Sequence, residues 1–409
     1  MNNKTILTFT GDIGFDHYMS EKWADPELVS EDIRSIFRTS DHVIINVEGA
    51  LVKREDAILR RVDSVEEQML HTIDPDAVSF LKKLPADIWN LSNNHIMDAG
   101  TMGLKSTLEL AAKNSISTIG AGMDKSDAAR PLYLDEAGGI GMFSVCYRPD
   151  CVEADEEKAG CISWADMDTI ERIIKEIRQK CRWCIMVVHG GEEFTSLPSP
   201  YTRDRYLKYL EMGADIIIGH HPHVPMNYEL VSTHDGTGSH ARENTSDHFL
   251  QDKLIVYSLG NFIFDTDYQR SQLNTNRGMI CSLSLNESGF DFKAYGIKLD
   301  REREKVLLAD LPDIFENIPE EEYKKLAPLS AKAFVNATKK QYIFLYPQEY
   351  DHADDEKWMD CFMDPDRSGR VPGEALDFEV IYPLAVEAEK GAWKESHLEG
   401  VIDYMLKQL

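Results

Sequence analysis

Six short apolar runs that each end in a cluster of polar residues are the feature that most constrains the fold of this 409-residue chain. They read TILTF followed by TGDIGFD, HVIINV by EGAL, ADIWNLS by NNHIMDAG, CIMVV by HGGEEF, ADIIIG by HHPHVP, and LIVYSL by GNFIFD. Helical patterns such as GLKSTLELAAKNS and TRDRYLKYLEMG separate several of the runs. Strands alternating with helices predict an α/β layered fold. Because ligands gather at the carboxyl ends of strands in such folds, the polar clusters are expected to converge on one crevice.

The densest cluster belongs to GADIIIGHHPHVP, residues 213–225, where a predicted strand ends in His220, His221 and His223. A single histidine after an apolar run is more often a hydrogen-bonded core residue than a ligand. Three histidines in four positions favour a site, because imidazoles two positions apart on an extended chain point to the same side and can share a metal. The stretch alone fits no closed zinc pattern, so other strands must supply partners.

Carboxylate, amide and imidazole side chains at the ends of the other predicted strands supply these partners: Asp12, Glu48, Asn94, His95 and His189. Mixed imidazole and carboxylate donors suit Zn, Mn or Fe(II) better than Ca or Mg. Two such ions about 3.5–4 Å apart would clamp the attacking and leaving oxygens of a phosphoester. The pattern therefore predicts a hydrolase site with one or two divalent transition metal ions.

The charge and the apolar content narrow the class of partner and the location. A net charge of −27 argues against nucleic acid and against an anionic membrane surface, since phosphate contacts need basic patches. No stretch approaches roughly 18 uninterrupted apolar residues, so no membrane-spanning helix is expected. The seven scattered cysteines favour reduced thiols over a disulfide framework, and we expect a cytoplasmic protein.

Residues after the last polar cluster change in character. The stretch RGMICSLSLNESGFDFKAYGIKLD predicts a pair of antiparallel strands with NESG as the turn. From about residue 305 the sequence becomes acidic and helical. We therefore predict a main domain over residues 1–304 and a mostly helical C-terminal extension over residues 305–409.

Six motifs carry a resemblance to a known family. GDIGFD, NVEGAL, LSNNHIMDAG, VVHGGEEF, IIIGHHPHV and VYSLGNFIFD resemble, in order and spacing, the motifs of the CapA family of poly-gamma-glutamate capsule synthesis proteins, over roughly residues 5 to 300. That family is related to the calcineurin-like metallophosphoesterases, which implies a four-layer α/β/β/α sandwich. The implied functions are a metal-dependent hydrolase of a phosphoester or gamma-glutamyl amide, or a capsule-assembly factor that binds metal or polymer without turnover. A third alternative is a relic whose histidines merely pack.

The resemblance also implies roles for individual residues. Metal ligands are Asp12, Glu48 near the bridging position, Asn94, His189, His221 and His223, with His220 as an alternative to His221. His95 resembles the general acid that protonates the leaving oxygen. Asp98 and Glu193 are expected to orient imidazoles or hold the substrate. Asn261 is placed at the substrate, with a turn after YSLG as the alternative role for it and for Asp265.

Two departures from the phosphoesterase pattern weaken the first metal position. Where that pattern has D-x-H the chain has DIG, so Gly14 offers no imidazole, and the aspartate motif GDxxD is replaced by NVE. The substrate is expected to be a small molecule or an anionic polymer. Since a chain with net charge −27 would repel polyglutamate, Arg203 and Arg277 are predicted to pair with a substrate anion at the pocket rim. The alternative is that both arginines are solvated on the surface.

Overall fold

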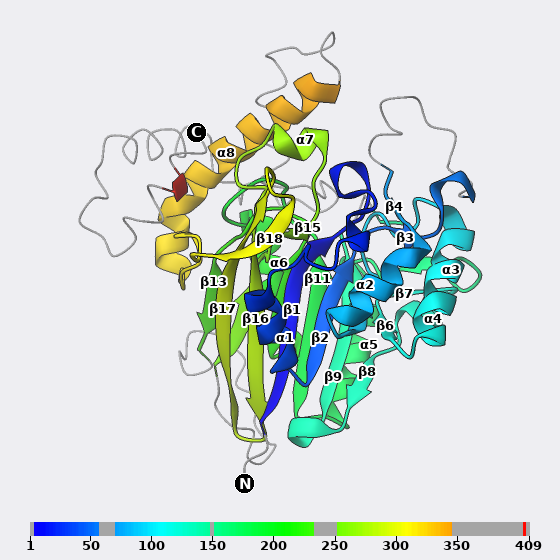
Figure 1. The fold of residues 1–409 in the computed structure, drawn as a ribbon. Helices are drawn as coiled ribbons and strands as arrows, with labels where there is room; N and C mark the ends of the chain where they lie inside the picture. Colours follow the sequence, from blue (N-terminus) through cyan, green and yellow to red (C-terminus); the bar gives the residue numbers. More distant parts are fainter. Residues whose placement is uncertain (1–3, 57–69, 148–150, 233–251, 346–403, 406–409) are drawn as a thin grey trace, which may run out of the picture.

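The computed structural model describes residues 4–56, 70–147, 151–232, 252–345 and 404–405, and two large sheets form its centre (Figure 1). The 8-stranded sheet runs in the order β18 (Lys305–Ala309), β17 (Gly289–Asp300), β16 (Arg277–Asn286), β1 (Thr5–Ile13), β2 (His42–Val47), β5 (Ala86–Asn90) and β6 (Ser117–Ile119), with β15 (Asn261–Ile263) also paired to β1. The 6-stranded sheet runs β13 (Tyr228–Val231), β14 (Lys253–Val256), β12 (Ile216–His220), β11 (Trp183–His189), β9 (Ile140–Cys146) and β8 (Leu132–Leu134).

Both sheets contain a block of parallel strands; the 6-stranded sheet has an antiparallel strand at each edge, and the 8-stranded sheet has antiparallel strands on its β18 side. Strands β1, β2, β5 and β6 are parallel, as are β9, β11, β12 and β14. The predicted pair of strands after the last cluster is β16 and β17, which are antiparallel and joined at Asn286 and Gly289. Small two-stranded sheets join β3 (Ala50–Leu51) to β4 (Thr72–Ile73) and β7 (Ala121–Gly122) to β10 (Gly160–Cys161).

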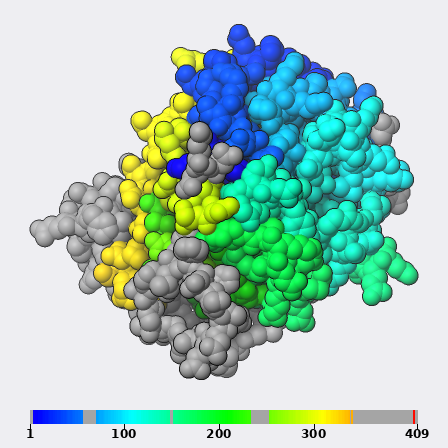
Figure 2. All heavy atoms as spheres, turned by 90° about the horizontal axis from the view of Figure 1, so that it is seen from below, coloured from blue at the N-terminus to red at the C-terminus, as the bar shows by residue number. Residues whose placement is uncertain are grey.

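The apolar strands are buried on both faces, and this produces the layers. In β11, Ile185 and Val187 join the core between the two sheets, whereas Met186 and Val188 face the helices outside. Successive residues of a strand point to opposite faces, so a continuous apolar run fits a sheet that is covered on both sides. Seen from the end where the parallel strands begin, the blue N-terminal residues lie on one side of the molecule and green residues of the 6-stranded sheet on the other (Figure 2).

Helices cover the outer face of each sheet. Those packed on the 8-stranded sheet are α1 (Glu31–Arg38), α2 (Val78–Lys83) and α3 (Gly100–Lys113), and those on the 6-stranded sheet are α5 (Met167–Arg178) and α6 (Pro200–Met212). The Ser199 hydroxyl accepts from the Thr202 amide and Gly213, at φ +123°, ends α6. The short helices α4 (Lys125–Ala128) and α7 (Asp267–Arg270) lie in connections. This arrangement confirms the predicted α/β/β/α sandwich.

The first residues of the predicted C-terminal extension belong to the sheet, because β18 pairs with β17. The long helix α8 (Glu320–Leu345) then packs on the connection after β11, where the Tyr323 hydroxyl donates to the Pro198 carbonyl over 2.9 Å. Most of residues 346–409 lie outside the described part, so the division at residue 304 stays a prediction. Among the helices that the structure describes, none combines the length and the apolar character needed to cross a membrane.

Candidate metal centre

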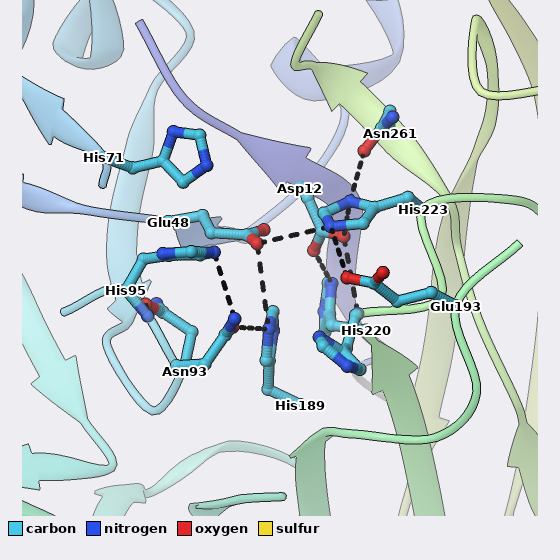
Figure 3. A network of polar contacts seen from close by, with 12 residues as sticks. Asp12, Glu48, His71, Asn93, His95, His189, Glu193, His220, His223 and Asn261 are labelled. Carbon is cyan, nitrogen blue, oxygen red and sulfur yellow. Dashed lines mark hydrogen bonds and ion pairs between the residues drawn. The ribbon is translucent and has the colours of Figure 1, made fainter. Parts of the chain in front are cut away.

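The carboxyl ends of strands from both sheets meet at one end of the sandwich, and they bring the predicted donors together (Figure 3). Asp12 is near the end of β1, Glu48 follows β2, and His189 is the last residue of β11. His220 is the last residue of β12 and pairs in register with His189. The convergence expected from the strand-end clusters is therefore present.

One group of potential metal ligands comprises Asp12, Glu48 and His189, which are all fully buried and each offer a donor atom within 4.8 Å of the others. The Glu48 Oε1 atom lies 3.8 Å from His189 Nε2 and has no hydrogen-bond partner among the described residues. The Asn94 Oδ1 atom lies 2.8 Å from the same His189 nitrogen. Two donors that each lie about 2.0–2.2 Å from one ion are roughly 3 Å apart, so Asn94 fits as a further ligand.

A second group comprises Glu193, His221 and His223, again with donor atoms within 4.8 Å of one another. Both imidazoles are buried, and neither His221 Nδ1 nor His223 Nε2 has a hydrogen-bond partner in the described part of the chain. The His223 Nε2 atom lies 3.7 Å from Glu48 Oε1 and 3.9 Å from Glu193 Oε1. Glu193 was expected to orient an imidazole or hold the substrate, and its carboxylate is placed as a potential ligand. Glu48 adjoins both groups.

The turn that carries His221 and His223 is not the extended chain on which the sharing of one metal was predicted. His221 has φ +95° and His223 has φ +57°, on either side of Pro222. A non-glycine residue in this region costs roughly 1–3 kcal/mol and persists only where its surroundings impose it. The two imidazoles nevertheless belong to one group of potential ligands, with their ring centroids 6.0 Å apart.

The protonation states of these residues fit a cation. Burial and the neighbouring His223 lower the pKa of His221 to about 3, and burial lowers the pKa of His223 to about 4, so both rings are neutral at pH 7 and keep a lone pair. Burial, followed by repulsion from Asp12, raises the pKa of Glu48 well above its usual value. A buried carboxylate with an unpaired oxygen beside neutral imidazoles is stabilised by a positive ion, so the residues fit one.

Further residues hold the donors in place. The Asn46 amide donates to Asp12 Oδ1 over 2.8 Å and to Glu48 Oε2 over 3.3 Å. His220 was predicted at the substrate or as an alternative ligand, but it is 1% exposed and its Nδ1 atom lies 3.0 Å from Asp12 Oδ1. It therefore positions Asp12. Asn261 Oδ1 lies 2.9 Å from His223 Nδ1, which fixes the tautomer that leaves Nε2 available.

His95 and Asp98 form a pair at the edge of the donors. The His95 Nδ1 atom lies 2.7 Å from Asp98 Oδ2, and the same oxygen accepts from the His71 amide over 2.8 Å. Burial lowers the pKa of His95, but attraction to Asp98 and the hydrogen bond outweigh it, and the net shift is upward. A proton on His95 near neutral pH suits the role of general acid that the family resemblance implies.

Of the two arginines predicted at the pocket rim, Arg203 is engaged elsewhere, and the prediction for Arg277 stays untested. Arg203 is buried, and its guanidinium makes two hydrogen bonds to Glu229, of 3.1 and 2.6 Å, so the prediction that it pairs with a substrate anion is wrong. Burying a guanidinium demands a fixed partner inside the protein, and Glu229 supplies it. Arg277 begins β16 half-buried, close enough to Tyr404 to oppose the rise of its pKa. Asp265 pairs with Arg270 and Arg301, in agreement with a structural role.

The sequence analysis missed Asn46, Asp16 and His71 as residues of this region. Asn46 pairs in register with Asp12, and a polar side chain inside an otherwise apolar strand was the available signal. His71 is buried with its ring 4.2 Å from that of His95, edge to face. As a lone histidine between motifs, it carried no pattern that would single it out.

The protein is an α/β/β/α sandwich, in which helices cover the outer faces of two facing sheets. Buried histidines and carboxylates at one end of the strands form a candidate metal centre. The chain belongs to the family of the bacterial capsule synthesis protein PGA_cap, whose family model matches residues 6–266. This finding confirms the resemblance drawn from the six motifs.

Curated relatives carry names from the same field. The PGA biosynthesis protein CapA of Bacillus subtilis is 28% identical over 271 residues, which cover 65% of this chain and 64% of that protein. The capsule biosynthesis protein CapA of Bacillus anthracis is 25% identical over 280 residues, or 66% of this chain and 62% of that one. The chain thus matches a little less than two thirds of the length of these relatives. A probable polyglutamine synthesis accessory protein of Mycobacterium tuberculosis is 24% identical over 198 residues, covering 42% and 51% of the two chains.

Proposed function

We propose that the chain acts in poly-gamma-glutamate capsule metabolism as a hydrolase that depends on one or two divalent transition metal ions. The observation that carries this proposal is the pair of adjacent donor groups in which Glu48 Oε1, His221 Nδ1 and His223 Nε2 are buried without hydrogen-bond partners among the described residues. Imidazole and carboxylate donors favour Mn, Fe(II) or Zn. Membership in the capsule synthesis family and the names of the relatives support the biological setting.

Each residue then has a defined task. Asp12, Asn94 and His189 would hold one ion, His221, His223 and Glu193 would hold the other, and Glu48 lies where it could serve both. When bound, such ions polarise a phosphoryl or carbonyl oxygen and make water more nucleophilic. His95, held by Asp98 through Nδ1, would protonate the leaving oxygen or nitrogen from Nε2, which lies 3.0 Å from Asn94 Nδ2 and would turn from that amide to the substrate. The substrate class is a phosphoester or a gamma-glutamyl amide.

A second candidate is a capsule-assembly factor that binds metal or polymer without turnover. A specific contact favours it: a side chain at Gly14, where phosphoesterases carry a histidine, would begin 2.7 Å from Phe264 Cε2. The ring of Phe264 thus occupies the place of that imidazole, and the site has one donor fewer than the phosphoesterase pattern.

The test compares protein purified without a metal-affinity tag with His223→Ala, His95→Gln and, as a matched control, His42→Gln. His42 pairs with Asp87 at the opposite end of β2 from Glu48. We expect bound Mn, Fe or Zn in the wild type and the control, and fewer ions per chain in His223→Ala. His95→Gln should retain the wild-type metal content without turnover of phosphoesters or gamma-glutamyl peptides. Metal without turnover in the wild type would favour the assembly factor, and no metal under any loading condition would refute both.

A further inference from the structure

A third group of potential ligands lies outside the two donor groups and outside the roles assigned by the motifs. It comprises Asp16 and His17, which follow β1, and His71, which precedes β4, and their donor atoms lie within 4.8 Å of one another. The His71 Nδ1 atom contacts Asp16 Oδ2, and the rings of His17 and His71 are 5.8 Å apart. Two imidazoles and one carboxylate on adjacent segments form a common three-ligand set for divalent transition metals.

The environment of His71 supports ligation over simple packing. The ring is fully buried, and its Nε2 atom has no hydrogen-bond partner among the residues that the structure describes. A core histidine that serves only to pack normally satisfies both nitrogens. Burial also lowers the pKa of His71, so the ring is neutral and keeps a lone pair that an ion can use.

A solvent-accessible route leads to this group. Asp16 and His17 line a cavity of about 510 Å³, and its other charged lining residues in the described part of the chain are Glu21, Glu55, Asp74 and Arg54. Four carboxylates against one guanidinium make the cavity attractive to cations and unattractive to anions. His17 is exposed, its ring contacts that of His71, and its donor atom lies within 4.8 Å of those of Asp16 and His71, so an entering ion can reach all three.

We propose that Asp16, His17 and His71 bind a divalent transition metal ion, such as Zn or Mn, at a site separate from the centre built on Asp12 and His223. The ion would enter through the acidic cavity. The ring of His71 contacts that of His95 at 4.2 Å, so the site borders the main centre (Figure 3). The set of one carboxylate and two imidazoles selects a transition metal over Ca or Mg, which prefer oxygen ligands throughout.

The test measures metal stoichiometry, without any activity assay, on the full chain stripped by a chelator and dialysed against Zn or Mn chloride. Asp16→Asn is nearly isosteric, and His17→Ala alters an exposed side chain, so both variants should fold; circular dichroism checks this. His42→Ala is the matched control, since it removes a histidine that belongs to none of the three groups of potential ligands. We expect the wild type and the control to bind one more ion per chain than either variant, or the variants to bind that ion at least about ten-fold more weakly.

A double variant, Asp12→Asn with His223→Ala, separates this site from the main centre. It should lose the ions of the main centre and keep one, which adding His17→Ala removes. If the double variant binds as many ions as the wild type, the proposed function fails and this site does not. Wild-type stoichiometry and affinity in folded Asp16→Asn, or in folded His17→Ala, would overturn the three-ligand site.

Discussion

Asn261 should control the metal affinity of His223 although it would not touch the ion. Its Oδ1 atom lies 2.9 Å from His223 Nδ1, and its amide donates to Gln269 Oε1 over 2.8 Å and to the Thr275 carbonyl over 2.9 Å. These two anchors fix the amide so that its oxygen faces the ring. The acceptor holds the His223 proton on Nδ1 and leaves the Nε2 lone pair free for a metal ion.

Asn261→Leu removes that acceptor with little change in volume. Loss of such a partner typically costs 10–100-fold in metal affinity, or about 1.4–2.8 kcal/mol. Because the amide also loses two buried hydrogen bonds, at about 0.5–1.5 kcal/mol each, the protein should become less stable as well. Affinity and stability must therefore be measured separately.

Gln269→Leu is the control that distinguishes the two effects. It removes one anchor of Asn261 and lowers stability, but Asn261 keeps its bond to Thr275 and its contact with His223. Competition with a fluorescent chelator at 20 °C or below, where both variants are folded, gives the dissociation constants. The reasoning is refuted if Asn261→Leu binds metal within two-fold of the wild type, or if Gln269→Leu loses as much affinity as Asn261→Leu.

Three further predictions follow from buried charges. Arg203→Met leaves the buried carboxylate of Glu229 unpaired, so the free energy of unfolding measured in urea should fall by about 3–5 kcal/mol while the metal content stays unchanged. A loss of metal in this variant would contradict a purely structural role of Arg203. Asp98→Asn removes the charge that raises the pKa of His95, so the alkaline limb of any hydrolytic pH profile should move to lower pH, and an unmoved limb would count against His95 as the acid. In metal-free folded protein, His221 stays neutral down to about pH 3 and His223 down to about pH 4, whereas the same side chains in the unfolded chain bind protons below about pH 6.5. The free energy of unfolding should therefore fall as the pH is lowered from 6.5 towards 4. A urea midpoint that stays constant over this range would disprove the prediction.

The layered fold and the convergence of donors were predictable because each depends on local patterns. An apolar run such as CIMVV can be buried on both faces only in a covered sheet, and parallel strands of such a sheet deliver the residues that follow them to one end. Asp12, His189 and His223 come together for this reason. Neither the layered fold nor the convergence of the donors requires knowing the order of the strands in each sheet.

The missed and misplaced residues depend on pairings that the sequence does not encode locally. Asn46 meets Asp12 through the register of β2 against β1, and a shift of one residue would turn it to the opposite face. Arg203 was expected at a substrate because the sequence does not show its partner. That partner, Glu229, lies on β13 and comes beside Arg203 only when the chain folds. His71 was passed over because a single histidine acquires meaning only from the residues that packing places beside it.

Phe264 explains why the first strand can lack the phosphoesterase histidine. Its ring lies over Gly14, where a Cβ would approach Cδ2 to 2.8 Å, and it also contacts the rings of His71 and His223 at 5.1 Å each. A histidine at position 14 therefore cannot be accommodated unless Phe264 moves, and moving Phe264 would disturb a candidate ligand of the main centre and one of the separate Asp16 site. The glycine, the phenylalanine and the additional imidazole of His71 thus form one packing unit. A histidine introduced at position 14 alone should therefore weaken the site.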